Sequence, residues 1–322
     1  FAYSSIMEDV DLVSGGPPCQ PFSMGGKHQA HKDDRDMFPA TAEVIGKLKP
    51  KAFIIENGKG LQRSPFLNYY NYILALLEFP EITRQTDETW VAHHKRLQQH
   101  ATSGSISGLS YSVMPQLLNA ANFGVPQKRE RVFFVGFRRD LDVRWNFPPE
   151  SHSYEALLVS QWITGDYWEN HGFSKRRRPT VPADLALRVA QLGRSNRRPD
   201  KYPWMTVRDA LKGVPEPTEK CQSFRNHRFQ DGARTYVGHT GSPLALPAKT
   251  LKAGDHGVPG GENMMVRDDG SVRYFTVRES ARLQTFPDTY ELHGSWTEAM
   301  RQLGNAVPVA LAQVVATSVA EK

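Results

Sequence analysis

The chain has 322 residues, 39% of them hydrophobic and 23% charged, which is enough for one large domain and a smaller one. It contains neither a run of roughly 20 uninterrupted apolar residues nor a basic and then apolar amino-terminal segment, so we expect neither membrane insertion nor secretion. The two cysteines, Cys19 and Cys221, lack the spacing of a disulfide framework or a zinc site. This predicts free thiols in a reducing compartment and no metal site.

Positive charge is the second bulk property. The formal net charge is +6 and the pI about 9.2, which favours polyanionic partners. Between His171 and Lys201, nine Lys or Arg residues accompany two acidic residues. Such a segment can neutralise DNA phosphates, but a solvated basic face has the same composition. The composition leaves both interpretations open.

The first 148 residues alternate between strand and helix patterns. Apolar runs predict buried strands at 10–14, 52–55, 111–113 and 132–136. Helical spacing predicts helices at 38–48 and 67–77. The stretch from about 78 to 109 is polar and poorly periodic. This alternation predicts an α/β fold with a parallel, doubly wound sheet whose functional residues lie on loops at the strand ends.

The pattern changes from about residue 149 to 275, where prolines, glycines and aromatic residues are scattered and long periodic segments are few. This predicts a second, smaller domain of mixed structure. Periodicity returns at Thr276, which can cap a helix that has Glu279 as its third residue. Another helix is expected at 307–319. We expect residues 276–322 to pack back on the first domain.

Cys19 lies in a proline-rich loop directly after the first strand, at the sheet edge where ligands usually bind. A thiol there can attack a bound substrate, although a lone cysteine is more often a small buried hydrophobic residue. Glu56 also follows a strand and should lie at the same edge, because parallel strands present their carboxyl ends on one side. The two residues predict a nucleophile beside an acid.

The segment 127–131 adds two guanidinium groups. Arg129 and Arg131 are expected on one face of an extended segment, since side chains two apart in a strand point the same way. Beside a thiol and a carboxylate they can lower the pKa of the thiol and hold an anionic group. A salt-bridged surface strand is the alternative interpretation.

Together these segments make the sequence resemble the DNA (cytosine-5) methyltransferase family. The family's ordered motifs are matched by Pro18-Cys19-Gln20, Glu56-Asn57, Gln127-x-Arg129-x-Arg131, the helix 278–284 and Gly304-Asn305-Ala306-Val307-Pro308. The resemblance implies a Rossmann-like methyltransferase sheet with a target-recognition domain at 149–275. It also implies double-stranded DNA as substrate, S-adenosylmethionine as methyl donor, and a cytoplasmic bacterial enzyme of a restriction-modification system.

The resemblance further implies residue roles. Cys19 would add to ring carbon 6 of cytosine, and Glu56 would stabilise the resulting negative charge through ring nitrogen 3. Arg129 would contact the ring oxygen and orient Glu56, while Arg131 and Gln127 would support the loop of Cys19. The methyl donor would contact Pro18, Phe38, Asn305 and Ala306.

Because the reacting atoms are buried in a duplex, the target base would be flipped out. The segment 23–38 is expected to act as a lid with hinge glycines and phosphate-binding cations, unless it is an ordinary surface loop. The residues expected to contact DNA are Gln20, Ser23, Gly25, Lys27, Thr250 and Leu251. Thr250 could equally be a capping residue.

The sequence departs from the family at its amino end. The family's first strand and its Phe-x-Gly-x-Gly turn, which hold the methionine part of the methyl donor, do not occur in this sequence. We therefore expect the first strands of the sheet to be missing from this chain, and activity to need an amino-terminal segment or partner subunit that carries the glycine-rich motif.

Two other functions stay open: a tRNA cytosine-5 methyltransferase, and a non-catalytic DNA-binding or regulatory module. The long recognition region and the lack of a Cys-Phe-Thr signature argue against the first. The intact Cys19, Glu56 and Arg129 argue against the second.

Overall fold

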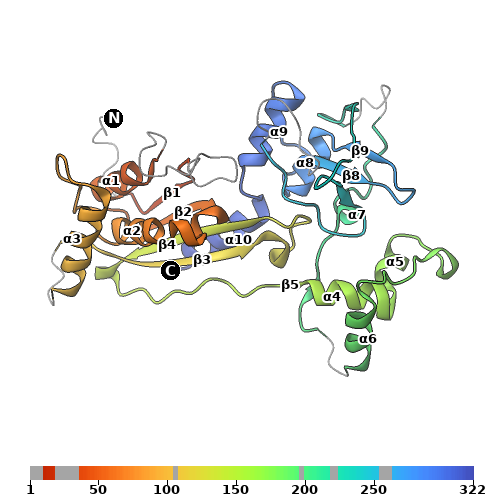
Figure 1. Ribbon diagram of the computed structural model, residues 1–322, viewed down its shortest axis with the longest axis horizontal. Helices are drawn as coiled ribbons and strands as arrows, with labels where there is room; N and C mark the ends of the chain where they lie inside the picture. Colours follow the sequence, from red (N-terminus) through yellow and green to blue (C-terminus); the bar gives the residue numbers. More distant parts are fainter. Residues whose placement is uncertain (1–9, 19–35, 104–107, 196–198, 218–223, 254–262) are drawn as a thin grey trace. The chain divides into compact units, whose positions relative to one another are not determined.

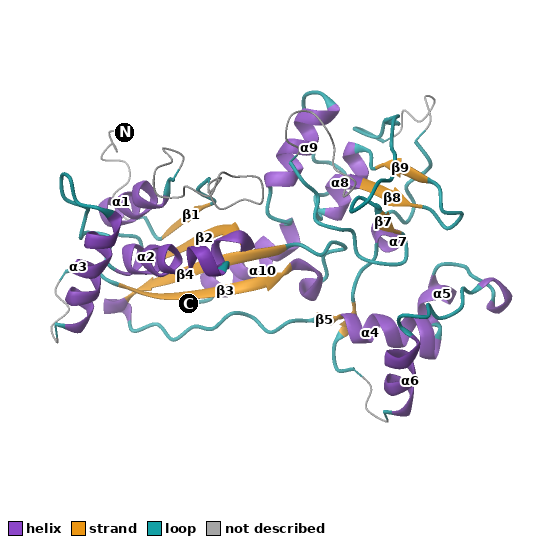
Figure 2. Cartoon of the chain, in the orientation of Figure 1, coloured by secondary structure: helices purple, strands orange, loops and turns teal. Residues whose placement is uncertain are grey.

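The computed structural model describes residues 10–18, 36–103, 108–195, 199–217, 224–253 and 263–322, which form two compact units (Figures 1 and 2). Unit 1 comprises Phe1–Leu118, Glu130–Phe147 and Ala316–Lys322, and unit 2 comprises Asn119–Arg129 and Pro148–Val315. The chain passes from unit 1 to unit 2 between Phe147 and Pro148, and it returns to unit 1 at Ala316.

Unit 1 is built on a four-stranded sheet. Its order is β1 (Leu12–Gly15), β2 (Ala52–Gly58), β4 (Glu130–Arg138) and β3 (Tyr111–Asn119). β1 and β2 run parallel, as predicted, but β4 runs antiparallel to β2, so the expectation of an all-parallel sheet is wrong. The connection from β3 to β4 holds only a short 3-10 helix, Ala120–Phe123, whereas parallel neighbours need a crossover of a dozen or more residues.

Two of the unit 1 helices were predicted. α1 (Phe38–Leu48) has the predicted bounds: Pro39 stands in its first turn, and Lys49 ends it in a left-handed conformation before Pro50. α2 (Leu67–Glu78) follows the short 3-10 helices Lys59–Gln62 and Ser64–Phe66. Both helices pack against β2 and β4 through a core that includes Ile45, Phe53, Ile73 and Phe134. This core fixes the sheet edge described below.

A third helix of unit 1, α3 (Trp90–Thr102), lies in the stretch that the sequence indicated to be irregular. Only His93 and Leu97 are buried on it, which is too narrow an apolar face for the periodicity to be recognised. Thr89 caps it by accepting a hydrogen bond from the Ala92 amide at 3.2 Å. The His93 ring joins α3 to α2 through a 2.9 Å hydrogen bond with the Tyr72 hydroxyl.

The first part of unit 2 is helical. It comprises α4 (Tyr154–Val159), a π-helical turn (Ser160–Thr164), α5 (Asp166–Asn170) and α6 (Ala186–Arg194), with a short ladder of β5 (His152–Ser153) and β6 (Tyr202–Pro203). Leu157, Tyr167 and Trp168 form its core. Among the described residues of this part, no α-helix exceeds the nine residues of α6, so the sequence showed no long periodic segment.

The second part of unit 2 combines a small sheet with helices. The elements are α7 (Val207–Ala210), β7 (Ser242–Pro243), β8 (Met264–Val266), β9 (Val272–Tyr274), α8 (Val277–Leu283), α9 (Trp296–Asn305) and α10 (Val309–Ala320), the last of which runs into unit 1. The predicted capping box of Thr276 and Glu279 is confirmed.

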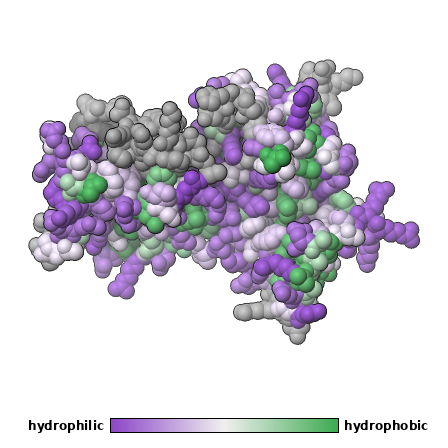
Figure 3. Space-filling view, viewed as in Figure 1, coloured by the Kyte–Doolittle hydropathy of each residue, from purple (hydrophilic) through white to green (hydrophobic). Residues whose placement is uncertain are grey.

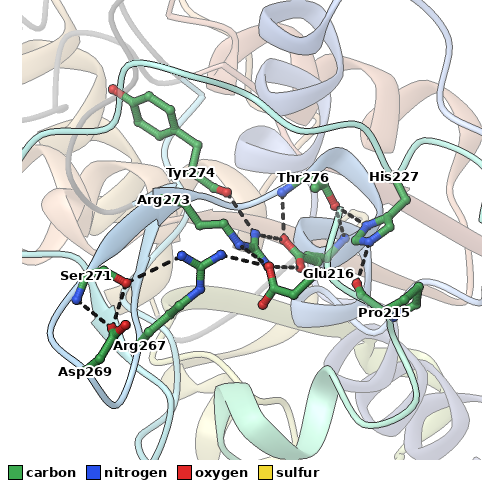
Figure 4. A network of polar contacts seen from close by, with 10 residues as sticks. Pro215, Glu216, His227, Arg267, Asp269, Ser271, Arg273, Tyr274 and Thr276 are labelled. Carbon is green, nitrogen blue, oxygen red and sulfur yellow. Dashed lines mark hydrogen bonds and ion pairs between the residues drawn. The ribbon is translucent and has the colours of Figure 1, made fainter. Parts of the chain in front are cut away.

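Figure 4 shows the buried polar network around this cap. Both carboxylate oxygens of Glu279 accept hydrogen bonds from Arg273, at 2.7 and 2.6 Å, and Glu279 also accepts one from the Thr276 amide at 2.8 Å. The His227 ring bridges the Thr276 hydroxyl and the Pro215 carbonyl. These contacts attach β9, Pro215 and His227 to the start of α8.

One stretch of the described residues, Trp296–Ala320, has the length and composition of a membrane-spanning helix. It consists of α9 and α10, which are separated by the non-helical residues Ala306–Pro308. Each helix is shorter than the roughly 20 residues that span a bilayer. The apolar residues Ala299, Met300 and Leu303 of α9 pack in the core of unit 2.

Candidate active site

Glu56 and Arg131 form an ion pair at the edge of the unit 1 sheet. Glu56 lies opposite Phe133 and Arg131 opposite Gly58, so the two side chains are diagonal neighbours across the β2–β4 pair. Nε of Arg131 lies 2.8 Å from Oε1 of Glu56, and the side chains are only 17% and 13% exposed. Burial lowers the pKa of Arg131 from its usual value, and the Glu56 carboxylate partly offsets this. The Arg131 guanidinium thus favours an ionised Glu56 in a partly desolvated place.

The loop that leads to Cys19 is fixed to the same strand end. The side-chain amide of Asn57 donates a 2.9 Å hydrogen bond to the carbonyl of Pro17, two residues before Cys19. A Cβ atom on Gly16 would lie 3.3 Å from Oε2 of Glu56, so the backbone of this loop packs closely on the carboxylate. Gly15 pairs with Ile55, which brings the ends of β1 and β2 together as predicted. The described part of the loop therefore lies beside Glu56.

Cys19 itself lies outside the described residues. So do Gln20, Ser23, Gly25 and Lys27, which the sequence indicated as DNA contacts, and most of the expected lid. The nucleophile and the lid therefore stay predictions.

Gln127 and Arg129 form a second polar group, within unit 2. Both are fully buried. Oε1 of Gln127 accepts the Leu251 amide at 3.0 Å, and its Nε2 donates to the Leu283 carbonyl at 3.3 Å. Arg129 donates to the carbonyls of Leu251 at 3.2 Å and Gly304 at 2.7 Å. Together they fasten the segment at residue 251 to the ends of α8 and α9.

These contacts give the motif residues partners that the sequence did not predict. The Arg131 guanidinium lies on Glu56, and Gln127 binds the segment at Leu251. The expected contacts of Arg129 with the cytosine ring and with Glu56, and of Gln127 with the loop of Cys19, stay predictions. Arg129 precedes β4, which begins at Glu130, so the alternation of a regular strand does not extend to it. Carbonyls in the last turn of a helix lack intrahelical partners, and the Leu283 and Gly304 carbonyls accept donors for that reason.

The segment 248–251 was expected to contact DNA. Ala248 pairs with Gln127 in an isolated parallel bridge, and the Thr250 hydroxyl donates a 2.7 Å hydrogen bond to the Lys128 carbonyl. Thr250 is partly exposed, and among the described residues no helix begins beside it, so the structure does not give it the capping role that was the alternative. Leu251 is fully buried in the core of unit 2, so its side chain is not displayed on the surface, and a contact of this residue with DNA stays a prediction.

Of the residues expected to contact the methyl donor, Pro18 and Asn305 are exposed and Ala306 is partly exposed. Phe38 is only 1% exposed, and its ring packs edge-on against Phe134 at 6.1 Å. The Phe38 ring is thus part of the core of unit 1, and its contact with the methyl donor stays a prediction.

Three residues of this region had no predicted role: Asn57, Gln284 and Gly304. Gln284 donates a 2.6 Å hydrogen bond to the Leu303 carbonyl. A Cβ atom on Gly304 would lie 2.2 Å from the Ala253 amide nitrogen, so only glycine fits there. In the sequence, each of these residues is a polar residue or a glycine next to an apolar strand or helix. That position suggests that the residue makes a close contact, but it does not identify the residue contacted.

The chain was compared with known families, proteins and structures. Residues 2–80 and 91–321 match the family described as C-5 cytosine-specific DNA methylase. The Type II methyltransferase M.AplI of Arthrospira platensis is 32% identical, over 96% of this chain and 68% of that protein. The Type II methyltransferase M.Bpa9945I of Bacillus paralicheniformis is 27% identical, over 96% and 70%.

Among solved structures, a mutant DNMT2 of Spodoptera frugiperda has a similar fold, with a TM-score of 0.51 at 16% identity over 96% of this chain and 79% of that one. The fold is therefore the mixed α/β fold that the sequence predicted. Because the family match covers most of the chain and M.AplI is similar over almost all of it, the chain belongs to the C-5 cytosine-specific DNA methylase family.

Proposed function

We propose that this chain methylates carbon 5 of cytosine in double-stranded DNA, with S-adenosylmethionine as the methyl donor, after the target base is flipped out. The observation that carries the proposal is the buried Glu56–Arg131 ion pair, which lies beside the Asn57–Pro17 hydrogen bond two residues before Cys19. Membership in the C-5 cytosine-specific DNA methylase family supports the assignment of substrate and reaction.

The chemistry begins with the Cys19 thiolate, which forms a bond to ring carbon 6 of cytosine. The electron pair of the 5,6 double bond then moves onto the ring, and nitrogen 3 becomes more basic. Glu56 supplies the proton that nitrogen 3 takes up. Glu56 enters this step as the carboxylic acid, or shares a proton with nitrogen 3, because the carboxylate alone has no proton to give. Once the proton has passed to nitrogen 3, the Arg131 guanidinium stabilises the Glu56 carboxylate that remains.

The carbon 5 atom is then nucleophilic and accepts a methyl group, for which S-adenosylmethionine supplies an electrophilic carbon. A base, for which bound water is the candidate, then takes the proton from carbon 5. The electron pair left behind restores the 5,6 double bond and expels the Cys19 thiolate, and nitrogen 3 returns its proton to Glu56. Pro18, Asn305 and Ala306 stay candidates for contacts to the donor, since each has exposed surface.

We also propose that activity needs a segment carrying the glycine-rich Phe-x-Gly-x-Gly motif, as part of the same polypeptide or as a partner subunit. In the described sheet, β1 is an edge strand and Leu12 on it is 40% exposed. An exposed apolar edge favours pairing with a further strand. The 322 residues alone should transfer little methyl from labelled donor to DNA, and adding that segment should restore transfer. Full activity without it would refute this part of the proposal.

The turn Tyr236–His239 of unit 2 is the element that we propose reads bases. Tyr236 and His239 pair in an antiparallel bridge, and Gly238 adopts a φ of +82° in the turn between them. Val237 at its tip is 100% exposed and Tyr236 is 51% exposed. Major-groove readers use such apolar and aromatic groups against thymine methyl groups and base edges.

This turn is attached to the segment that Gln127 and Arg129 hold. Lys249 donates a 2.8 Å hydrogen bond from Nζ to the Thr240 hydroxyl, and its backbone amide donates to the Ser242 hydroxyl at 3.0 Å. The base-reading turn is therefore fixed to the network around Leu251.

The test is covalent trapping on duplex DNA that contains 5-fluorocytosine, with methyl donor and the glycine-rich segment supplied. Fluorine cannot leave as a proton does, so the Cys19 adduct should persist on a denaturing gel. Cys19→Ser should abolish the adduct while DNA binding is retained, and Cys221→Ser should leave it intact. DNA binding without an adduct in the unaltered protein would favour a non-catalytic module. An adduct formed with tRNA alone would favour the tRNA methyltransferase.

The relatives named Type II methyltransferases also support a place in a restriction-modification system. A bacterial strain that lacks this methylation should then be sensitive to an endonuclease from the same source, and the cloned methyltransferase should protect its DNA.

A further inference from the structure

Three consecutive cations, Lys175, Arg176 and Arg177, form a short 3-10 helix in the connection from α5 to α6; we refer to them as the basic tip. All three are exposed. In the described part of the chain, no carboxylate lies within ion-pair distance of any of them. In Figure 3, hydrophilic side chains project from the surface at the position of this connection.

The basic tip is held at both ends. Before it, Phe173 packs edge-on against Trp168 with the ring centres 5.3 Å apart, and its amide donates to the Trp168 carbonyl at 2.9 Å. After it, Arg178 donates a 2.5 Å hydrogen bond to Glu169 of α5. The Arg178 guanidinium also packs on Gly165, where a Cβ atom would collide with it. The tip is therefore a closed loop with fixed ends, which lowers the entropy lost when it binds a partner.

Charge compensation is common among the exposed cations elsewhere. Lys47 pairs with Glu43, Lys51 with Asp11 and Arg188 with Glu155, with separations of 2.5 to 2.7 Å. Three adjacent cations without such partners repel one another and gain most from an external polyanion. A solvated basic face thus explains the tip less well than an anionic partner does.

We infer that the basic tip contacts phosphates of the DNA backbone and so contributes affinity but no sequence preference. This inference rests on the proposed function, because it takes double-stranded DNA as the partner. Phosphate contacts fix the position of a protein on the duplex, whereas base contacts specify the sequence. The tip and the turn Tyr236–His239 then have separate tasks.

The geometry sets the size of the effect. Successive side chains of a 3-10 helix are about 120° apart, so about two of the three cations can face one surface. Each neutralised phosphate contributes about 0.9 to the slope of log Kobs against log salt concentration. We therefore expect the tip to contribute about 1.8 to the slope. When the salt concentration rises fourfold, this contribution alone should weaken DNA binding about 12-fold.

The experiment measures binding of a random-sequence duplex by fluorescence anisotropy between low and high salt, with the natural full-length protein. The variant K175A/R176A/R177A should show the slope reduced by about 1.8, with unchanged sequence preference and an unchanged thermal midpoint. The variant K175R/R176K/R177K, which keeps all three charges, should keep the slope.

The matched control is K47A/K51A/R188A, which removes the same net charge from exposed cations that already have carboxylate partners. Its slope should change much less than that of the tip variant. Equal slopes for the tip variant and this control would overturn the inference and leave the proposed function untouched. Failure of the unaltered protein to bind duplex DNA at any salt concentration would overturn both.

Discussion

Nε of Arg131 lies 2.8 Å from Oε1 of Glu56, and the next arginine along the chain toward the amino end, Arg129, donates to the carbonyls of Leu251 and Gly304. Two arginines of one motif thus have different environments: one binds a carboxylate and the other binds main-chain carbonyls. The consequence is that equivalent substitutions at the two positions should have different effects.

Arg131→Lys should keep the fold and the positive charge but lose the planar donor that orients Glu56. We expect kcat to fall about 100-fold or more, as when one preorganised donor is removed from an active site, with DNA affinity retained. Arg129→Lys should instead lower the free energy of unfolding by about 1–3 kcal/mol for each buried carbonyl left unsatisfied. Single-turnover methyl transfer and urea unfolding separate the two effects. A catalytic defect at constant stability in Arg129→Lys would show that this division of roles is wrong.

Gly304→Ala should destabilise unit 2, because the added Cβ atom would lie 2.2 Å from the Ala253 amide nitrogen. Main chain cannot move aside as a flexible side chain does, so we expect a loss of about 1–3 kcal/mol or more in urea unfolding. Gly193→Ala in α6 is the matched control, because nothing lies within 4 Å of its added atom. That substitution should stabilise by about 0.5–1 kcal/mol. Equal effects of the two substitutions would contradict the close packing at Gly304.

His93 should make unit 1 sensitive to acid. Burial lowers its pKa below the usual 6.5, and the neutral ring bonds the Tyr72 hydroxyl and the Ile82 carbonyl at 2.9 and 2.8 Å. Since the unfolded chain takes up the proton first, this stability is fully present above pH 6.5 and is lost as the pH falls through 6.5 toward the pKa of the folded state. Burial also raises the pKa of Tyr72 to about 12, so its hydroxyl stays protonated throughout.

Thermal melts between pH 8 and pH 5 test this expectation. The unaltered protein should lose more stability on acidification than His93→Gln does. His293→Gln, at an exposed position, should behave like the unaltered protein. An identical pH dependence of all three would show that His93 does not titrate in this range.

Val237 substitutions should change which sequence is methylated while leaving the reaction itself intact. The side chain is fully exposed at the tip of its turn, so Val237→Thr and Val237→Gly cost little stability. At one base pair we expect discrimination to change by about 1–3 kcal/mol, or about 5- to 150-fold. Bisulfite sequencing of methylated genomic DNA would record the change. Val91→Thr, at an exposed valine of α3, is the control and should leave the methylation pattern unchanged.

Much of unit 1 was predictable because its signals are local. The bounds of α1 follow from the spacing of apolar residues that begins at Phe38 and from Pro50 just beyond the end of the helix. The capping box at Thr276 is also a local signal, because it depends on four consecutive residues. The sequence did not predict α3, because only two of its residues are buried and one of them is His93. A histidine does not count as apolar when a pattern of apolar residues is sought.

The partners of the site residues could not be predicted from the sequence, for a common reason. Spacing places Arg129 and Arg131 on one face, but their partners are 122 and 75 residues away in the sequence, at Leu251 and Glu56. Phe38 has the right residue type for stacking on a base, and only the packing of Phe134 against it shows that the ring is buried. The nature of the chemistry was readable from the motifs, whereas the choice between two similar side chains depended on tertiary contacts.

The bonds from Gln127 and Arg129 to Leu251, Leu283 and Gly304 all use backbone atoms. Every residue type offers the same carbonyl oxygen and, proline aside, the same amide. An exposed neighbour such as Val237 can therefore be exchanged without breaking these four bonds. If the turn at Val237 reads bases as we propose, these main-chain bonds let the target sequence change by point substitution while the reaction centre is preserved.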